Sequence, residues 1–119
     1  MKPVRVELGG EEKRLRFDFN AMADFEEVMG YGLFAALQES QIGFKTIRAF
    51  YWAGLRWKEK GLTLERTGNL LSKELSEGTE LQDLMEPIEK ALMNSGILPD
   101  QDKQEESDTD QDEDEEKNE

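Results

Sequence analysis

The chain is short and acidic: it has 119 residues and a formal net charge of −13, with no histidine and no cysteine. Its length fits one small domain, and the missing cysteines exclude a disulfide framework and a thiolate metal site. The missing histidines remove the commonest metal ligand and proton shuttle near neutral pH. An acidic chain without a basic stripe is repelled by phosphates, so we expect no nucleic-acid partner.

Two stretches near the N-terminus alternate between apolar and charged residues. Their apolar positions are Val4, Val6 and Leu8, then Leu15, Phe17 and Phe19. Residues 9–12, which include two glycines, predict a four-residue loop that closes a β-hairpin. In that register Val6 faces Leu15 and Val4 faces Phe17, on one buried side. A lone hairpin is marginal in water, so it has to lie against helices or against another chain's strand, and a homo-oligomer stays open.

A helix is predicted next, with Asn20 as its N-cap and Met29 near its end. Its apolar positions recur at helical spacing: Met22, Phe25, Val28 and Met29. Residues 30–32 (Gly-Tyr-Gly) break this helix, and residues 33–38 predict one or two further helical turns.

Residues 44–61 contain both tryptophans and predict a core helix around which the other elements pack. One broad face of this helix is apolar: Phe44, Ile47, Phe50, Tyr51, Gly54, Leu55 and Trp57. Lys60 and Gly61 supply the cation and the C-cap that a helix end favours. Gly54 costs about 1 kcal/mol of helix propensity relative to alanine, so we expect a second helix to cross closely there.

Two further helices are predicted before residue 96. The first runs from an N-cap at Thr63 to about Leu75, with these leucines inward: Leu64, Leu70, Leu71 and Leu75. The second starts at a capping box of Thr79 and Gln82 and has apolar residues at helical spacing: Leu81, Leu84, Met85, Ile88 and Leu92. We expect Pro87 to kink or split this helix and Gly96 to end it.

The C-terminal segment differs sharply in composition. Residues 100–119 carry 12 acidic and 2 basic side chains, a net charge of −10, and no aromatic or aliphatic residue. Such a segment cannot offset its ordering entropy by burial, so we expect a disordered acidic tail. Its role is either simple solubilisation or masking of, and steering toward, a basic partner. Residues 1–99 then form one α+β domain, mainly α: an N-terminal β-hairpin followed by four to five packed helices.

No catalytic, cofactor-binding or metal site is predicted, so we expect a protein that is not an enzyme. Asp24, Glu26 and Glu27 spread around the exposed side of a helix, where we interpret them as solvated. The N-terminus has no apolar run long enough for a signal peptide, and no stretch approaches a membrane span. We therefore expect a soluble protein of the cytoplasm, without membrane contact.

Two aromatic residues are candidates for contact with a protein partner: Phe34 and Trp52. Trp52 falls well off the apolar stripe of its helix. Either a second element covers it, or it is an exposed anchor of the kind that tryptophan often supplies at interfaces. Phe34, in a short segment that follows a glycine, has the same two interpretations.

Four segments follow one another in a recognisable order: Asp18-Phe19-Asn20-Ala21, then Phe25-Glu26-Glu27 with Gly30, then Tyr51-Trp52-Ala53-Gly54-Leu55, then Gly61-Leu62-Thr63-Leu64-Glu65. Their order and spacing, over residues 14 to about 96, resemble the small tail assembly chaperones of long-tailed siphophages, in particular the tail-tube-associated, gene-transfer-agent type. The resemblance rests on order and spacing and not on any single motif. It supplies no catalytic or binding residues for this sequence.

The resemblance implies a non-catalytic, mostly helical protein that binds the tape measure protein and tail tube subunits, in the host cytoplasm, before the tube polymerises. A tape measure protein is a long apolar helix, and an amphipathic domain with aromatic anchors is suited to hold it by helix-in-groove packing. The charged tail would keep the complex dispersed. The alternative is an acidic regulatory or nucleic-acid-mimic protein, whose tail occupies a basic partner's binding site.

Overall fold

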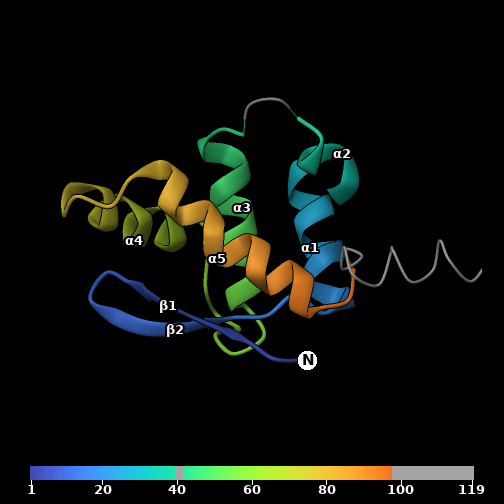
Figure 1. Cartoon of the computed structure of the whole chain (residues 1–119), viewed down its shortest axis with the longest axis horizontal. Helices are drawn as coiled ribbons and strands as arrows, with labels where there is room; N and C mark the ends of the chain where they lie inside the picture. Colours follow the sequence, from blue (N-terminus) through green and yellow to red (C-terminus); the bar gives the residue numbers. More distant parts are fainter. Residues whose placement is uncertain (40–41, 98–119) are drawn as a thin grey trace, which may run out of the picture.

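The structure, a computed structural model, describes residues 1–39 and 42–97. Within these residues a two-stranded hairpin precedes five helices (Figure 1). The elements are β1 (Val4–Leu8), β2 (Glu11–Leu15), α1 (Phe19–Met29), α2 (Leu33–Leu37), α3 (Phe44–Leu55), α4 (Leu64–Ser76) and α5 (Leu81–Asn94). The predicted fold class, a hairpin followed by a mainly helical domain, is confirmed. The predicted disordered tail, residues 100–119, lies outside the described residues.

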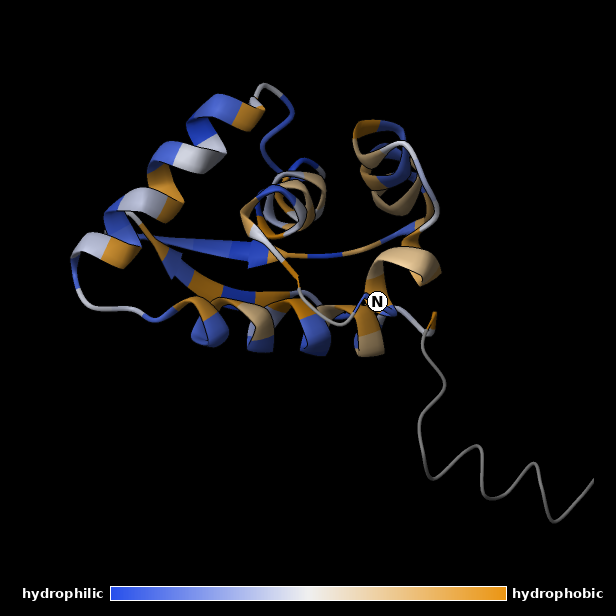
Figure 2. Cartoon of the chain, turned by 90° about the horizontal axis from the view of Figure 1, so that it is seen from above, coloured by the Kyte–Doolittle hydropathy of each residue, from blue (hydrophilic) through white to orange (hydrophobic). Residues whose placement is uncertain are grey.

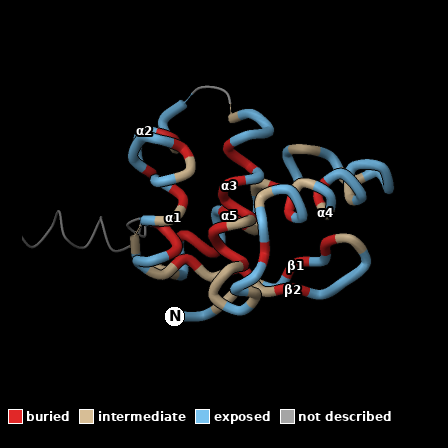
Figure 3. Tube along the Cα trace, turned by 180° about the vertical axis from the view of Figure 1, so that it is seen from behind, coloured by how far each residue is buried: buried red, intermediate tan, exposed pale blue. Residues whose placement is uncertain are grey.

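Helix α3 lies at the centre of the fold, between α1 and α4, with the hairpin across its C-terminal end (Figure 1). Figure 3 shows the buried residues gathered along α3 and on the parts of α1, α5 and the hairpin that face it. The hydrophobic side of α5 faces the hairpin, and its hydrophilic side faces outward (Figure 2). Phe50 of α3 stacks on Phe25 of α1 with ring centroids 4.1 Å apart, and Phe17 meets it edge-on at 6.0 Å. The core therefore forms around α3, as the sequence predicted.

The hairpin turn is shorter than predicted. Gly9 and Gly10 form it alone, with φ of 60° and 82°. Two consecutive residues with positive φ make the two-residue turn whose twist matches that of the strands. The chain can therefore reverse within the glycine pair, and the predicted four-residue loop is wrong.

The shorter turn sets the pairing register of the hairpin. Val4 lies opposite Leu15 and Val6 opposite Lys13. The predicted pairs, Val6 with Leu15 and Val4 with Phe17, are thus displaced by two residues. Because side chains alternate with a period of two, this shift leaves the same face buried. Phe17 is still fully buried, although it follows β2 instead of belonging to it.

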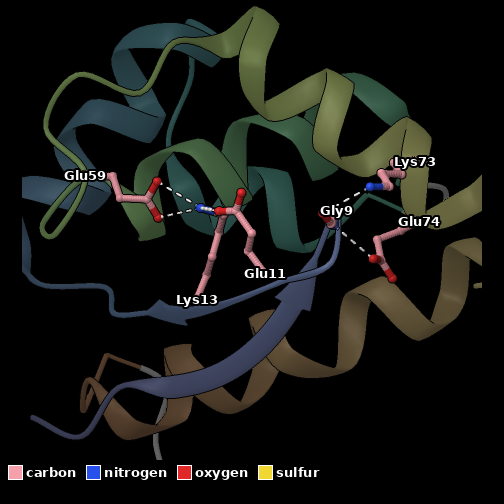
Figure 4. Close-up of polar contacts among 6 residues, drawn as sticks. All are labelled: Gly9, Glu11, Lys13, Glu59, Lys73 and Glu74. Atoms are coloured by element: carbon pink, nitrogen blue, oxygen red, sulfur yellow. Dashed lines mark hydrogen bonds and ion pairs between the residues drawn. The ribbon is translucent and has the colours of Figure 1, made fainter.

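Polar contacts tie the middle of β2 and the hairpin turn to other parts of the molecule (Figure 4). Lys13, on the buried face, lies 3.2 Å from Glu11 and donates to both carboxylate oxygens of Glu59 at 3.0 Å. Burial alone lowers the pKa of Lys13, but hydrogen bonds to the two glutamates outweigh burial and raise that pKa. At the turn, the Gly9 N–H donates to the Glu74 carboxylate of α4 at 3.0 Å.

Helix α3 ends at Leu55 and not at Gly61 as predicted. After it the chain folds back along β2, where the Trp57 indole N–H donates to the Arg14 carbonyl at 3.1 Å. Glu59 reaches Lys13 from the same segment. These contacts with β2 replace the last helical turns, which the apolar stripe and the Lys60-Gly61 end had predicted. The Trp57 bond also occupies the Arg14 carbonyl of β2.

Gly54 is a point of close approach, but β2 and not a helix makes the contact. A Cβ atom at this position would lie 2.7 Å from Leu15 Cδ2 and 2.9 Å from Phe17 Cζ. The Arg16 N–H donates to the Gly54 carbonyl at 2.9 Å. The predicted crossing helix is therefore wrong, but the predicted close approach of another element at Gly54 is confirmed.

The apolar stripe of α3 predicts its core residues with one error. Ile47, Phe50, Tyr51 and Leu55 are all buried. Phe44, predicted to be buried with them, is 69% exposed. It is the first residue of the helix, where it borders a hollow beside Leu71 and Leu75 of α4 instead of packing into the core. Angular position on a helix identifies a face, but not how far along the helix its neighbours extend.

Helix α1 begins one residue before the predicted cap. Asp18 is the N-cap, and its Oδ1 accepts the Ala21 N–H at 2.8 Å. Asn20 therefore lies inside the first turn. An aspartate accepts this hydrogen bond with a carboxylate, which also interacts favourably with the helix dipole.

The caps and apolar faces of α4 and α5 follow the prediction with small shifts. Thr63 caps α4 as predicted, whereas the capping box of α5 pairs Glu80 with Asp83, one residue later than expected. Helix α5 continues unsplit through Pro87. Of the four leucines predicted to point inward from α4, Leu71 is buried, Leu64 and Leu70 are half-buried, and Leu75 is exposed.

Candidate functional site

The strongest candidate site is an apolar hollow between α1 and α2, with a volume of about 210 Å³. We call it the α1–α2 groove. Its lining consists of Phe19, Met22, Ala23, Glu26, Leu33, Phe34 and Ile97. One charged residue occurs among these seven, so the groove suits apolar groups.

A reversal of the chain builds the groove. Helix α1 ends at Gly30, whose φ of 85° is the left-handed conformation that glycine adopts most readily. The chain returns through Gly32, and α2 starts at Leu33. The Glu26 carboxylate of α1 accepts the Leu33 N–H at 2.7 Å. This bond satisfies one of the free N–H groups at the start of α2 and fixes α2 against α1.

The groove has a buried floor and an exposed aromatic rim. Met22 and Leu33 form the floor, with exposures of 8% and 2%. Phe19 and Phe34 form the rim, with exposures of 83% and 55%. Large aromatic side chains left in water beside an apolar hollow are typical of a surface that binds another macromolecule.

Tyr31, which precedes α2, forms a hydrogen bond with a residue that follows α2. Its hydroxyl donates to the Glu39 carboxylate at 2.7 Å, across the length of α2. The bond to that carboxylate raises the pKa of Tyr31. Helix α2 is thus held at its start by Glu26 and beyond its end by Tyr31.

The structure separates the two aromatic residues that the sequence singled out. Phe34 lies on the rim of the groove. Trp52 lies on α3, does not line the groove, and is half-buried. Its indole N–H donates to the Leu62 carbonyl at 2.9 Å, and the Arg56 guanidinium stacks on its ring at 4.7 Å. The segment before α4 therefore covers part of Trp52, as in the first of its two interpretations.

Phe19 is the rim residue that sequence reasoning missed. The alternation of Leu15, Phe17 and Phe19 placed it on the buried face of a strand. In the structure Asp18 starts a helix at that point, and Phe19 turns outward. The signal that could have revealed this is the aspartate itself, a preferred N-cap three residues before the backbone N–H that it binds.

The acidic residues of α1 do not converge. Asp24 pairs with Arg56 at 2.8 Å, and Glu26 accepts the Leu33 N–H. In residues 1–39 and 42–97, no three acidic, histidine or cysteine side chains gather in a way that could hold a metal ion. No helix in the same residues is both long enough and apolar enough to cross a membrane. Comparison of the chain with family models, curated proteins and solved structures found no match.

Proposed function

We propose that the protein is a non-catalytic assembly chaperone of a long-tailed phage. In this proposal it binds the tape measure protein, with the tail tube subunit as a second partner, during tail morphogenesis. Two observations support it: the resemblance of the sequence to such chaperones and the exposed aromatic rim of the α1–α2 groove. The rim is the observation that carries the proposal, because it offers apolar surface to another polypeptide.

The size of the groove favours a protein side chain over a small molecule. Its volume of about 210 Å³ lies below the roughly 300–1,000 Å³ typical of small-molecule sites. An apolar helix presents side chains at i, i+3 and i+4, and one such side chain can enter the hollow while its neighbours contact the rim. Burial of an exposed phenylalanine contributes roughly 1.5–3 kcal/mol. Phe19 and Phe34 together can thus supply much of the affinity for such a helix.

The alternative function, mimicry of an acidic ligand for a basic partner, depends on residues 100–119. These residues lie outside the described structure. In the described residues no observation favours that alternative over the groove.

Co-expression tests the proposed function. The tape measure protein of the same phage is produced alone and with this protein, and its soluble fraction is measured. A clear rise in the soluble fraction on co-expression is expected, because the groove would shield the apolar helix of one tape measure protein from other copies of it. An unchanged soluble fraction, for the tape measure protein and the tube subunit alike, would contradict the proposal.

A further inference from the structure

A second hollow, of about 280 Å³, lies between the start of α1 and the segment that follows α3. We call it the arginine pocket. Its charged and aromatic lining consists of Arg16, Asp18, Asp24, Arg56, Trp57 and Lys60. It does not share a residue with the α1–α2 groove, although both border α1.

The two guanidinium groups of the pocket are held in the same way, each between a tryptophan ring and an aspartate. Arg16 lies 4.3 Å from the Trp57 ring centroid, and Arg56 lies 4.7 Å from that of Trp52. The aspartate contacts are Arg16 Nη2 to Asp18 Oδ2 at 3.1 Å and Arg56 Nη1 to Asp24 Oδ2 at 2.8 Å. A guanidinium fixed on two sides loses little conformational freedom when it binds a further anion.

The cations of the pocket are only partly compensated. A guanidinium has five N–H donors, and one aspartate cannot satisfy them all. The Nε atoms of Arg16 and Arg56 are shielded from solvent and donate to no acceptor in the described residues. Lys60 forms no ion pair within the same residues. Three cations thus face two carboxylates, which leaves the pocket positive in a chain of net negative charge.

We propose that the arginine pocket binds carboxylates of the chain's own acidic segment, residues 100–119. This segment carries a net charge of −10, which complements the excess positive charge of the pocket. The last described residue, Ile97, lies against α1 in the α1–α2 groove. The chain therefore leaves the described structure beside α1, on the face of this helix opposite the pocket. Residues 98–119 are long enough to reach it, since an extended chain spans about 3.3 Å per residue. This interaction does not depend on the proposed chaperone function.

The interaction is expected to be electrostatic and to need several carboxylates. The side chains of Arg16 and Arg56 are 31% and 35% exposed, so water and salt screen each single contact. A segment with 12 acidic residues can place a new carboxylate in the pocket whenever one leaves. Between about 0.01 M and about 1 M salt, the Debye length falls from about 30 Å to about 3 Å, and the contact should be lost over that range.

The two tryptophans of the chain report on the pocket directly, because each stacks on one of its arginines. The experiment compares tryptophan emission of the full chain with that of a full-length variant in which the acidic residues of 100–119 are replaced by their amides. Different emission at low salt, converging at high salt, is the expected result. Identical emission at low salt would overturn the proposal.

A peptide of residues 100–119, added to the amide variant, tests the location. The proposal predicts saturable binding that Lys60→Gln and Arg16→Lys each weaken several-fold. Lys60 is exposed and makes no ion pair in the described residues, so its replacement does not threaten the fold. The matched control is the pair Lys45→Gln and Arg48→Gln, two cations of α3 that line another hollow. Equal weakening by the control pair, or no binding of the peptide, would contradict the assignment.

Discussion

Glu26 of α1 accepts the backbone N–H of Leu33 at 2.7 Å, and this contact holds the start of α2 against α1. Helix α2 has five residues and no side-chain cap of its own, since Gly32 is its N-cap. A helix this short does not persist without tertiary contacts. The shape of the α1–α2 groove therefore depends on a carboxylate that sequence reasoning assigned to a solvated surface.

Glu26→Ala should loosen α2 without unfolding the protein. The substitution leaves the Leu33 N–H without its charged acceptor, which we expect to cost about 1.5–3 kcal/mol locally. The measurement is amide hydrogen exchange of residues 33–37, which should become faster while exchange in α3 stays the same. Unchanged exchange in α2 would show that other contacts hold it.

Gly54→Ala should destabilise the fold. A methyl group would lie 2.7 Å from Leu15 and 2.9 Å from Phe17, both fully buried. Overpacking costs about 1–3 kcal/mol, and the gain in helix propensity, about 1 kcal/mol, offsets only part of it. Denaturant unfolding measures the difference in free energy.

Gly68→Ala is the matched control for that substitution. Gly68 lies inside α4, and a Cβ atom there would meet only the flexible Arg48 side chain, at 3.4 Å. This variant should be as stable as the parent or more stable, by up to about 1 kcal/mol. If both alanine variants are more stable than the parent, the close approach of β2 at Gly54 does not lower the free energy of unfolding of the Gly54→Ala variant.

Stability should fall at alkaline pH. Burial, with a contribution from Glu74, raises the pKa of Tyr51, whose hydroxyl donates to the Leu84 carbonyl at 2.7 Å. Above about pH 10 the unfolded state loses the tyrosine proton and the folded state keeps it, so the free energy of unfolding decreases as pH rises. The raised pKa of Lys13 acts in the same direction, above its ordinary value of 10.5.

Tyr51→Phe isolates the tyrosine contribution to that pH dependence. Below pH 9 the variant should lose about 0.5–1.5 kcal/mol with the hydrogen bond to Leu84. Between about pH 10 and 11.5 its stability should fall less steeply than that of the parent. Denaturant midpoints across that range provide the comparison, and parallel curves for the two proteins would contradict the assignment to Tyr51.

The sequence predicted most elements because local signals and tertiary packing agree in them. The stripe of α3, the cap at Thr63 and the break at Gly30 all recur in the structure. Errors occurred where distant contacts decide the outcome. The apolar stripe and the Lys60-Gly61 end predicted a helix to Gly61, but Trp57 and Glu59 bind β2 instead. No local pattern contains that information.

The candidate site was predictable only in part. Phe34 was identified from the sequence because it is an aromatic residue in a short, glycine-flanked segment. Phe19 was not, since its alternation with Leu15 and Phe17 imitates a strand. The groove arises from the first turns of α1 and the start of α2, and Ile97 joins them from the far end of the domain. Tertiary packing brings these segments together, and the spacing of residues in the sequence does not predict it.

The account depends on the aromatic rim of the α1–α2 groove as a binding surface for an apolar helix. The most direct measurement is the affinity of purified protein for a peptide from the tape measure protein, compared among the parent, Phe19→Ser with Phe34→Ser, and Phe44→Ser. Phe44 is as exposed as the rim residues but does not line the groove, so it controls for general loss of apolar surface. The account predicts at least a ten-fold loss of affinity for the rim variant, from the roughly 1.5–3 kcal/mol that each phenylalanine contributes, and little change for Phe44→Ser. Equal affinity of the parent and the rim variant would contradict it.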